Sequence, residues 1–309
     1  MTGIALYGNN GHQITEAAKS LRGARLCGSF GFTVPGLRRY ASEEELAGDA
    51  SVTLVSVCAD LRSQQGAIIR RLLEAGKDVY AEKPLAMSAE EIRALYALAR
   101  EKGRFLGEMS DTVFQQPYAK LKELAAAGTV GRIIQVHVQK SYPYADWRPQ
   151  DEDRDGGLIR QCAVHAVRIL EQGLGLRIDG AHAVETSLGN PVAGGGLKMA
   201  ACLVFGTKSG AVCSVDANYL NPKGNDFWCN EGVRVFGERG CMEADFRTCT
   251  VTVTDDAGKR IVRCEREEGN AYLQAVIDFL NGAGARPLTD EEEMRPSLIL
   301  AEVKNAVDR

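Results

Sequence analysis

The chain has 309 residues, of which 45% are hydrophobic and 25% are charged, and its formal net charge is -4. This length predicts about two domains, and the balanced charge disfavours a nucleic-acid-binding surface. Nine cysteines without a Cys-x-x-Cys pair indicate buried thiols in a reducing compartment. The first residues form a strand pattern and no apolar run approaches membrane-spanning length, so we expect a cytoplasmic protein without a membrane partner.

Short apolar runs alternate with longer amphipathic segments over the first hundred residues. This rhythm predicts strands that crossover helices join into a parallel sheet. The expected strands cover residues 3–7, 24–29, 52–58, 78–81 and 105–106, and the expected helices cover residues 12–21, 64–75 and 88–103. Ser88 followed by Glu91 forms a capping-box pattern, which predicts that the last of these helices begins at Ser88.

The character of the sequence changes after a helical segment at residues 115–127. Longer alternating strands are expected at residues 133–139, 181–188, 198–205, 211–219, 233–236 and 250–254, and helices at 158–174, 271–280 and 297–307. Such a pattern predicts a second, α+β domain with an open, mainly antiparallel sheet, one face of which helices cover. The fold class is therefore α/β, and we place the domain boundary between residues 115 and 116.

A glycine-containing loop, Gly8-Asn9-Asn10-Gly11-His12-Gln13, follows the first expected strand. It matches the Rossmann fingerprint Gly-x-Gly-x-x-Gly at the first glycine, whereas Asn10 and Gln13 occupy the other two glycine positions. Gly8 can make the tight turn, Asn10 tolerates left-handed angles, and the N-terminus of the next helix would offer N–H groups to a pyrophosphate. The loop predicts a phosphate site, with a plain strand-to-helix turn as the alternative.

The end of the second expected strand bears on the choice of nucleotide. A Rossmann domain that binds NAD usually carries an acidic residue there, but residues 27–31 contain none. Ser29 is the candidate for a ribose contact, and Arg38 or Arg39 for contact with a 2′-phosphate. NAD and NADP both remain open.

Residues 74–84 combine a helix end, a strand, and Glu82-Lys83-Pro84 at the carboxyl end of that strand, where open α/β sheets bind ligands. This arrangement resembles the glucose-fructose oxidoreductase/inositol dehydrogenase/rhizopine catabolism protein family (Gfo/Idh/MocA). The resemblance extends to Gly-Arg-Ile-Ile at 131–134, Gly156-Gly157 before a helix that carries His165, and Arg-Pro-Leu-Thr at 286–289. It implies a Rossmann dinucleotide-binding domain at residues 1–115 and a substrate-binding and oligomerisation domain at residues 116–309.

The candidate catalytic residues are Lys83 and His165. An ammonium at the sheet edge can hydrogen-bond a sugar hydroxyl and stabilise a developing alkoxide, and the resemblance implies that Lys83 contacts substrate and the nicotinamide ribose. The resemblance also implies that His165 is the general acid/base, with a structural imidazole as the alternative. The family carries Asp where this chain has Gln161 and Arg168, and Gln161 can orient an imidazole or bind a hydroxyl but cannot take a proton.

Two sets of further candidates complete the expected site. The substrate-binding candidates are Lys83, Gln161, Arg160, Arg148, Tyr142 and Asp111. The cofactor-binding candidates are Gly8, Asn9, Asn10, Gly11, His12, Gln13, Ser29, Cys58, Ala59, Glu82 and Lys83. No histidine has a partner at metal-ligand spacing, so we expect no metal site.

These patterns and the resemblance together predict an NAD- or NADP-dependent oxidoreductase that acts on a hydroxyl group of a sugar, polyol or sugar derivative. A homodimer or homotetramer through the C-terminal sheet is expected, because a large open sheet needs cover. One alternative is a sugar lyase or hydrolase that uses tightly bound NAD in a closed redox cycle. Another is a non-catalytic, dinucleotide-binding regulatory protein.

Overall fold

The computed structural model describes residues 1–266 and 270–308, which form two compact units. The first unit contains the residues up to Asp111, the segment Glu152–Gly156 and a segment that ends at Ala301. The second unit contains Thr112–Asp151, a segment that begins at Gly157, and the residues from Glu302. The assignment of a nucleotide domain to residues 1–115 and a substrate domain to residues 116–309 stays a prediction.

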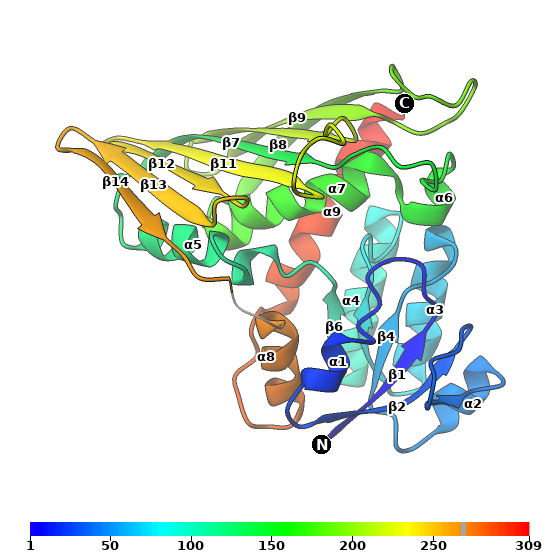
Figure 1. Ribbon diagram of the computed structural model, residues 1–309. Coiled ribbons are helices and arrows are strands. Elements are labelled where there is room, and N and C mark those ends of the chain that lie inside the picture. The colour runs from blue at the N-terminus through cyan, green and yellow to red at the C-terminus, as the bar shows by residue number, and fades with distance from the viewer. Residues whose placement is uncertain (267–269, 309) are drawn as a thin grey trace. The chain divides into compact units, whose positions relative to one another are not determined.

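A six-stranded parallel sheet forms the centre of the first unit (Figure 1). Its strands are β1 (Thr2–Tyr7), β2 (Ala24–Phe30), β3 (Arg38–Arg39), β4 (Leu54–Val57), β5 (Asp78–Ala81) and β6 (Leu106–Glu108). The spatial order is β3-β2-β1-β4-β5-β6, the order of doubly wound dinucleotide-binding folds. The order reverses between β1 and β4, and in such sheets ligands bind at the carboxyl ends of the strands beside this point.

The first unit also contains helices, several of which cover the sheet. They are α1 (Ala17–Ser20), α2 (Glu43–Gly48), α3 (Arg62–Glu74), α4 (Ala89–Lys102), α6 (Glu152–Asp155), α8 (Ala271–Leu280) and the part of α9 (Asp290–Val307) that ends at Ala301. Ile69 and Leu72 of α3 and Leu95 of α4 are completely buried in one apolar core with β4 and β5. The Ser88 side chain accepts a hydrogen bond from the Glu91 N–H, so the predicted cap of α4 is confirmed.

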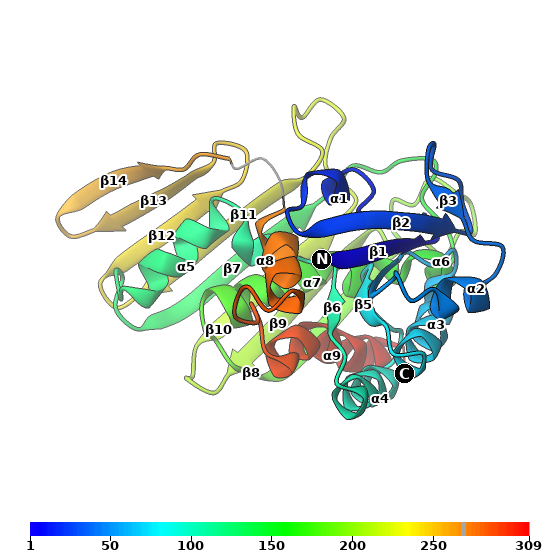
Figure 2. The ribbon, with the colours of Figure 1, turned by 90° about the horizontal axis from the view of Figure 1, so that it is seen from below.

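An eight-stranded, mostly antiparallel sheet dominates the second unit (Figure 2). Its strands are β7 (Ile133–Ser141), β8 (Ile178–Thr186), β9 (Ala200–Thr207), β10 (Val212–Asn218), β11 (Asn230–Gly237), β12 (Gly240–Asp245), β13 (Thr250–Asp255) and β14 (Gly258–Arg263). The order is β14-β13-β12-β11-β7-β10-β9-β8, and only β7 and β10 pair in parallel. The predicted parallel sheet and mainly antiparallel sheet are therefore confirmed.

Helices lie against one face of this second sheet (Figure 1). The helical segments of this unit are η1 (Thr112–Phe114), α5 (Tyr118–Ala126), α7 (Gly157–Arg168), η2 (Ile169–Gly173) and the part of α9 from Glu302. Val136 and Val138 of β7 are buried under the helices. Gln135, one position before Val136, points to the other face and is exposed. This alternation follows from the two-residue period of a strand with one covered face.

A buried ion pair links two central strands of the second sheet. The Lys140 ammonium of β7 lies 2.6 Å from the Glu231 carboxylate of β11, and these two residues are paired across the strands. Burial lowers the pKa of Lys140, but the charge and hydrogen bond of Glu231, together with the nearby Tyr142 and Cys229, outweigh this effect, so the pKa lies above its usual value. A charge buried this deeply is stable only with its partner, so the pair fixes the register of β7 against β11.

One expectation about the elements is wrong, and two strands were not predicted. Residues 12–21 do not form one helix: α1 begins only at Ala17, because Gly11 has φ 123° and Gln13 uses its side chain to accept the Ile14 N–H. Strands β12 and β14 were not expected. The sequence of β14 carries three cations, and the strand lies at the sheet edge, where charged strands are common. Their pairing partners determine these strands.

Two further observations concern the whole of the described chain. All nine cysteines are free thiols. Across residues 1–266 and 270–308, none of the helices is both long and apolar enough to cross a membrane.

Candidate active site

The Gly8–Gln13 loop lies at the carboxyl end of β1, where the strand order of the first sheet reverses. Gly8 has φ 68°, and a Cβ there would lie 2.2 Å from the Cys58 carbonyl oxygen. A Cβ on Gly11 would lie 2.5 Å from the Glu82 Oε2 atom. Both glycines are therefore needed, because the loop packs directly on the ends of the neighbouring strands.

Asn10 and Gln13, which replace two fingerprint glycines, hold the loop through their side chains. The Asn10 amide donates to the carbonyl oxygens of Asp60 at 2.9 Å and Arg154 at 2.8 Å. The Gln13 amide donates to the Gly8 carbonyl oxygen at 2.8 Å. Asn10 does not use the left-handed angles that asparagine tolerates, since Cys249 is the only described non-glycine residue with positive φ. Side-chain hydrogen bonds, not left-handed backbone, fix the loop at these positions.

The Glu82 carboxylate lies beneath the loop and is only 1% exposed. Its Oε2 accepts the His12 backbone N–H and lies 2.9 Å from the His12 Nδ1. Its Oε1 accepts the Lys83 backbone N–H at 2.9 Å and lies 3.5 Å from the Lys83 ammonium. Burial raises the pKa of Glu82, but the Lys83 charge and the His12 hydrogen bond outweigh it, so this pKa lies well below its usual range. Glu82 is thus an ionised link between the loop and Lys83.

The turn that carries Lys83 is held on two sides. Gln65 of α3 donates to the carbonyl oxygens of Glu82 and Pro84 at 2.5 and 2.9 Å. A Cβ on Gly156, whose φ is 92°, would lie 2.3 Å from the Pro84 ring, so only glycine fits. Lys83 itself is 3% exposed. Its ammonium therefore has a fixed position at the carboxyl edge of the sheet.

Two residues of α3, Arg62 and Gln65, support the site and were not expected to belong to it. Arg62 donates to the Asn10 carbonyl oxygen at 2.7 Å and to the Gln65 side chain at 2.7 Å, so it connects the loop to the Lys83 turn. The available signal was the polar pair Arg62 and Gln65, three residues apart on the helix face that also buries Ile69.

Other cofactor-binding candidates lie at the same edge. Cys58 and Ala59 follow β4 and are buried beside the Gly8 loop, and burial raises the pKa of the Cys58 thiol. Ser29, at the end of β2, is buried and donates to the Phe32 carbonyl oxygen at 2.9 Å. Arg38 is paired with Glu45 and Asp49. The first unit thus gathers all the cofactor-binding candidates along the carboxyl edge of one sheet.

His165 lies on α7 in the second unit and is half-buried. The Thr112 hydroxyl lies 2.7 Å from its Nδ1, which fixes the orientation of the imidazole ring. Thr112 was not expected, because 53 positions separate it from His165 in the sequence. Arg168, at the second position where the family has Asp, is fully buried and bonds Gln172 at 3.4 Å.

Aromatic and cationic side chains continue from α7 across the second unit. Gln161 donates to the Tyr219 hydroxyl at 3.3 Å. The Arg148 guanidinium stacks 3.8 Å above the Tyr219 ring and 5.7 Å from the Tyr142 ring. Gln161, Arg148 and Tyr142 therefore share one cluster, which Tyr219 completes. Of the remaining candidates, Arg160 is buried on α7, and Asp111 is the last residue of the first segment of the first unit.

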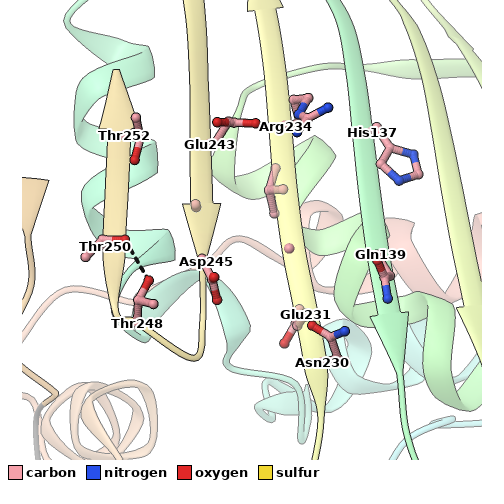
Figure 3. Close-up of a pocket in the computed structure, with 13 residues that line it drawn as sticks. His137, Gln139, Asn230, Glu231, Arg234, Glu243, Asp245, Thr248, Thr250 and Thr252 are labelled. Atoms are coloured by element: carbon pink, nitrogen blue, oxygen red, sulfur yellow. Dashed lines mark hydrogen bonds and ion pairs between the residues drawn. The ribbon is translucent and has the colours of Figure 1, made fainter. Parts of the chain in front are cut away.

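The outward face of the second sheet carries a polar hollow of about 510 Å³. The hollow lies over β7, β11, β12 and β13 (Figure 3), and Arg234 and Glu243, which form an ion pair of 2.5 Å, are among its lining residues. None of the candidate site residues lines this hollow. Separately, the described residues contain no group of three His, Cys, Asp or Glu side chains that could hold a metal ion.

The sequence also matches known families. Residues 9–109 match the model of the oxidoreductase family with an NAD-binding Rossmann fold, and residues 118–243 match the GFO/IDH/MocA C-terminal domain. The class of protein is therefore an oxidoreductase-family chain with a Rossmann nucleotide-binding fold. The chain belongs to the Gfo/Idh/MocA family, so the resemblance found in the sequence is confirmed.

Individual relatives agree with this assignment. The chain is 26% identical to myo-inositol 2-dehydrogenase of Thermotoga maritima over 85% of this chain and 79% of that protein. It is 35% identical to 1,5-anhydro-D-fructose reductase of Ensifer adhaerens over 41% of this chain and 39% of that protein. An Agrobacterium radiobacter oxidoreductase, solved with NAD+, L-tartaric acid and magnesium, has a TM-score of 0.82 at 15% identity, covering 100% of this chain and 96% of that chain. The last similarity shows the shared fold.

The charge on Glu82 predicts a specific acid sensitivity. Because its pKa is lowered on folding, the unfolded chain binds more protons below about pH 4.3, and the stabilisation from ionised Glu82 is lost as the pH falls through this range. We expect E82Q to be less stable at pH 7 by about 1–3 kcal/mol. Its loss of stability between about pH 5 and 3 should be shallower than that of the wild type by up to about 1.4 kcal/mol per pH unit.

Urea unfolding of the protein without added nucleotide, at a series of pH values, measures both effects. The exposed residue Glu74 provides the matched control E74Q, which should follow the wild-type profile. An E82Q profile parallel to the wild type would contradict an ionised Glu82.

Proposed function

We propose that the chain is an NAD- or NADP-dependent oxidoreductase acting on a hydroxyl group of a sugar, polyol or sugar derivative. The observation that carries this proposal is the buried Lys83, which Glu82 ties to the Gly8–Gln13 loop at the carboxyl edge of the first sheet. The relatives, a myo-inositol 2-dehydrogenase and a 1,5-anhydro-D-fructose reductase, support the same reaction class.

The loop fits a dinucleotide in its backbone geometry. Gly8 and Gly11 have positive φ, so the loop can turn tightly at the carboxyl end of β1, where doubly wound folds bind the dinucleotide. We propose that the loop holds the cofactor with Ser29, Cys58, Ala59, Glu82 and Lys83. When bound, the nicotinamide supplies the hydride acceptor of the reaction.

In this proposal His165 accepts the proton of the substrate hydroxyl. If the Nδ1–H donates to Thr112 Oγ1, Nε2 carries the lone pair and can take the hydroxyl proton of the substrate. Lys83 stabilises the negative charge that develops on the same oxygen. Gln161 binds a hydroxyl but cannot carry the proton, so His165 acts without the carboxylate that the family usually places there.

Further residues of both units are proposed to bind the substrate. Arg148 and Tyr142 belong to the cluster around Tyr219, where a guanidinium and aromatic faces can hold several hydroxyls. Arg160 and Asp111 complete the proposed set.

Loss of either proposed catalytic side chain should reduce turnover strongly. We expect H165A and K83A to lower kcat for a responsive polyol or sugar by about 10²–10⁴-fold, because general acid/base and oxyanion interactions act mainly in the transition state. Nicotinamide absorbance at 340 nm under saturating substrate measures the rate. The control is H182Q, which changes an exposed histidine of β8 and should keep wild-type turnover.

Near wild-type turnover of H165A and K83A would refute these roles. The same assay tests the closed redox cycle: that mechanism produces no reduced nicotinamide in proportion to product, whereas the proposed dehydrogenase releases one reduced nicotinamide per hydroxyl oxidised.

We also propose that the chain forms a homodimer or homotetramer through the outward face of the second sheet. Val184 and Val204, on the neighbouring strands β8 and β9, and Val212 on β10 expose apolar side chains on this face. Val204 and Val212 line a shallow hollow of about 450 Å³ there. Such an apolar surface on a paired-strand face supports contact with a second copy.

A charge in this apolar area should disrupt self-association. We expect V204E to shift the protein toward the monomer, because a buried carboxylate without a partner is costly at an interface. Light scattering coupled to size-exclusion chromatography measures the mass. The control V192E places the same charge on an exposed loop residue and should keep the wild-type mass. A monomeric wild type, or an unchanged mass of V204E, would contradict the proposal.

A further inference from the structure

The two tryptophans of the chain lie together on the surface of the second unit. Trp147 and Trp228 come from different loops, and their rings stack with centroids 6.2 Å apart at an interplanar angle of 16°. Trp147 is nevertheless 69% exposed and Trp228 is 52% exposed. Indole rings are large apolar surfaces, and an exposed pair of them indicates a binding surface rather than a core contact.

A hollow of about 530 Å³ adjoins the two rings. Its apolar lining comes from Trp147, Trp228 and nearby loop residues, and its polar lining comes from Asp146, Lys223, Asn225 and Asp226. This volume is typical of small-molecule pockets. Two carboxylates against one ammonium disfavour a phosphorylated or otherwise anionic ligand. The lining suits a neutral ligand with an apolar face and hydrogen-bonding groups at its edges.

A continuous series of contacts within the second unit joins this hollow to the proposed catalytic histidine. The Trp228 ring lies 6.3 Å from the Tyr142 ring, and the Arg148 guanidinium lies 5.1 Å from the Trp147 ring. Arg148 also stacks on Tyr219, whose hydroxyl accepts from Gln161, one helical turn before His165. The hollow therefore continues the substrate-binding cluster of α7.

We propose that this hollow binds a second pyranose ring, so that the substrate is a disaccharide or another glycoside rather than a free monosaccharide. This inference rests on the proposed function, because it extends the substrate of that reaction. The axial C–H groups of a pyranose pack against the face of an indole ring. Its equatorial hydroxyls can donate to Asp146 and Asp226 and accept from Lys223 and Asn225. A neutral sugar matches both the apolar wall and the charge of the rim.

Intrinsic tryptophan fluorescence tests the proposal directly, because both tryptophans of the chain adjoin the hollow. The wild-type protein, without nucleotide, is titrated with cellobiose, maltose and lactose and with glucose and galactose as the matching single rings. We expect at least one disaccharide to change the emission and to bind about tenfold more tightly than its component sugars.

Variants assign this preference to the rings. W147A and W228A should each lower the affinity for that disaccharide about tenfold, as measured by calorimetry, and leave monosaccharide affinity unchanged. W147F should keep part of the preference because it retains an aromatic face. I261A, which removes an exposed apolar side chain on β14 outside the hollow, is the matched control and should bind like the wild type.

Three results would overturn the inference. The first is equal affinity for single and double rings, or no detectable binding of any disaccharide. The second is an unchanged preference for the disaccharide in W147A and W228A. The third is a change in oligomer mass in these variants without a change in sugar affinity. The last result would make the hollow a contact between copies of the chain.

The binding assay needs no turnover, so it separates this inference from the proposed function. A protein that binds disaccharides through the tryptophans but transfers no hydride keeps the second-ring site and refutes the oxidoreductase. A protein that oxidises monosaccharides and shows no disaccharide preference supports the oxidoreductase and refutes the second-ring site.

Discussion

The arrangement of the first unit's candidate site depends on the contacts of the buried Glu82 carboxylate. An ionised carboxylate that is 1% exposed is stable only if donors and cations replace its water. Here the loop backbone, the His12 ring and Lys83 provide them. Gly11 must therefore lack a Cβ, because Glu82 fills that space. The loop after β1 and the turn after β5 are in this way one electrostatic unit, although many residues separate them in the sequence.

The second unit places its polar groups by a different means. A helix packed on a mainly antiparallel sheet carries His165, and one short hydrogen bond with Thr112 fixes the imidazole. Beneath it, the Lys140–Glu231 pair holds two central strands in register. Rigid secondary structure thus supports the proposed acid/base group, while the loops that carry Trp147 and Trp228 expose the aromatic surface proposed for specificity.

Local chemistry explains which parts of the fold could be predicted from the sequence. The strand 78–81 is four buried residues between a helix stop and Pro84, and Ser88 with Glu91 forms a cap that needs no distant partner. Both elements were therefore predictable. The shortened α1 and the charged strand β14 were not, because a side-chain hydrogen bond and a neighbouring strand determine them.

The same distinction applies to the candidate site. Lys83 and His165 stand in short motifs that the sequence displays directly. Thr112, Gln65 and Arg62 act through contacts with residues far away in the chain, and no spacing rule connects them. Sequence patterns therefore indicate the reactive groups, whereas the residues that orient them emerge only from the folded structure.

The most direct test of the account is calorimetric titration of the purified protein with NAD+ and NADP+. The account predicts that one of them binds at one molecule per chain, and that G11A weakens this binding at least about tenfold, because the added Cβ would displace Glu82 from the loop. G76A is the matched control, since Gly76 also has positive φ but faces open space. A wild type that binds neither dinucleotide, or a G11A protein that binds as tightly as the wild type, would contradict it.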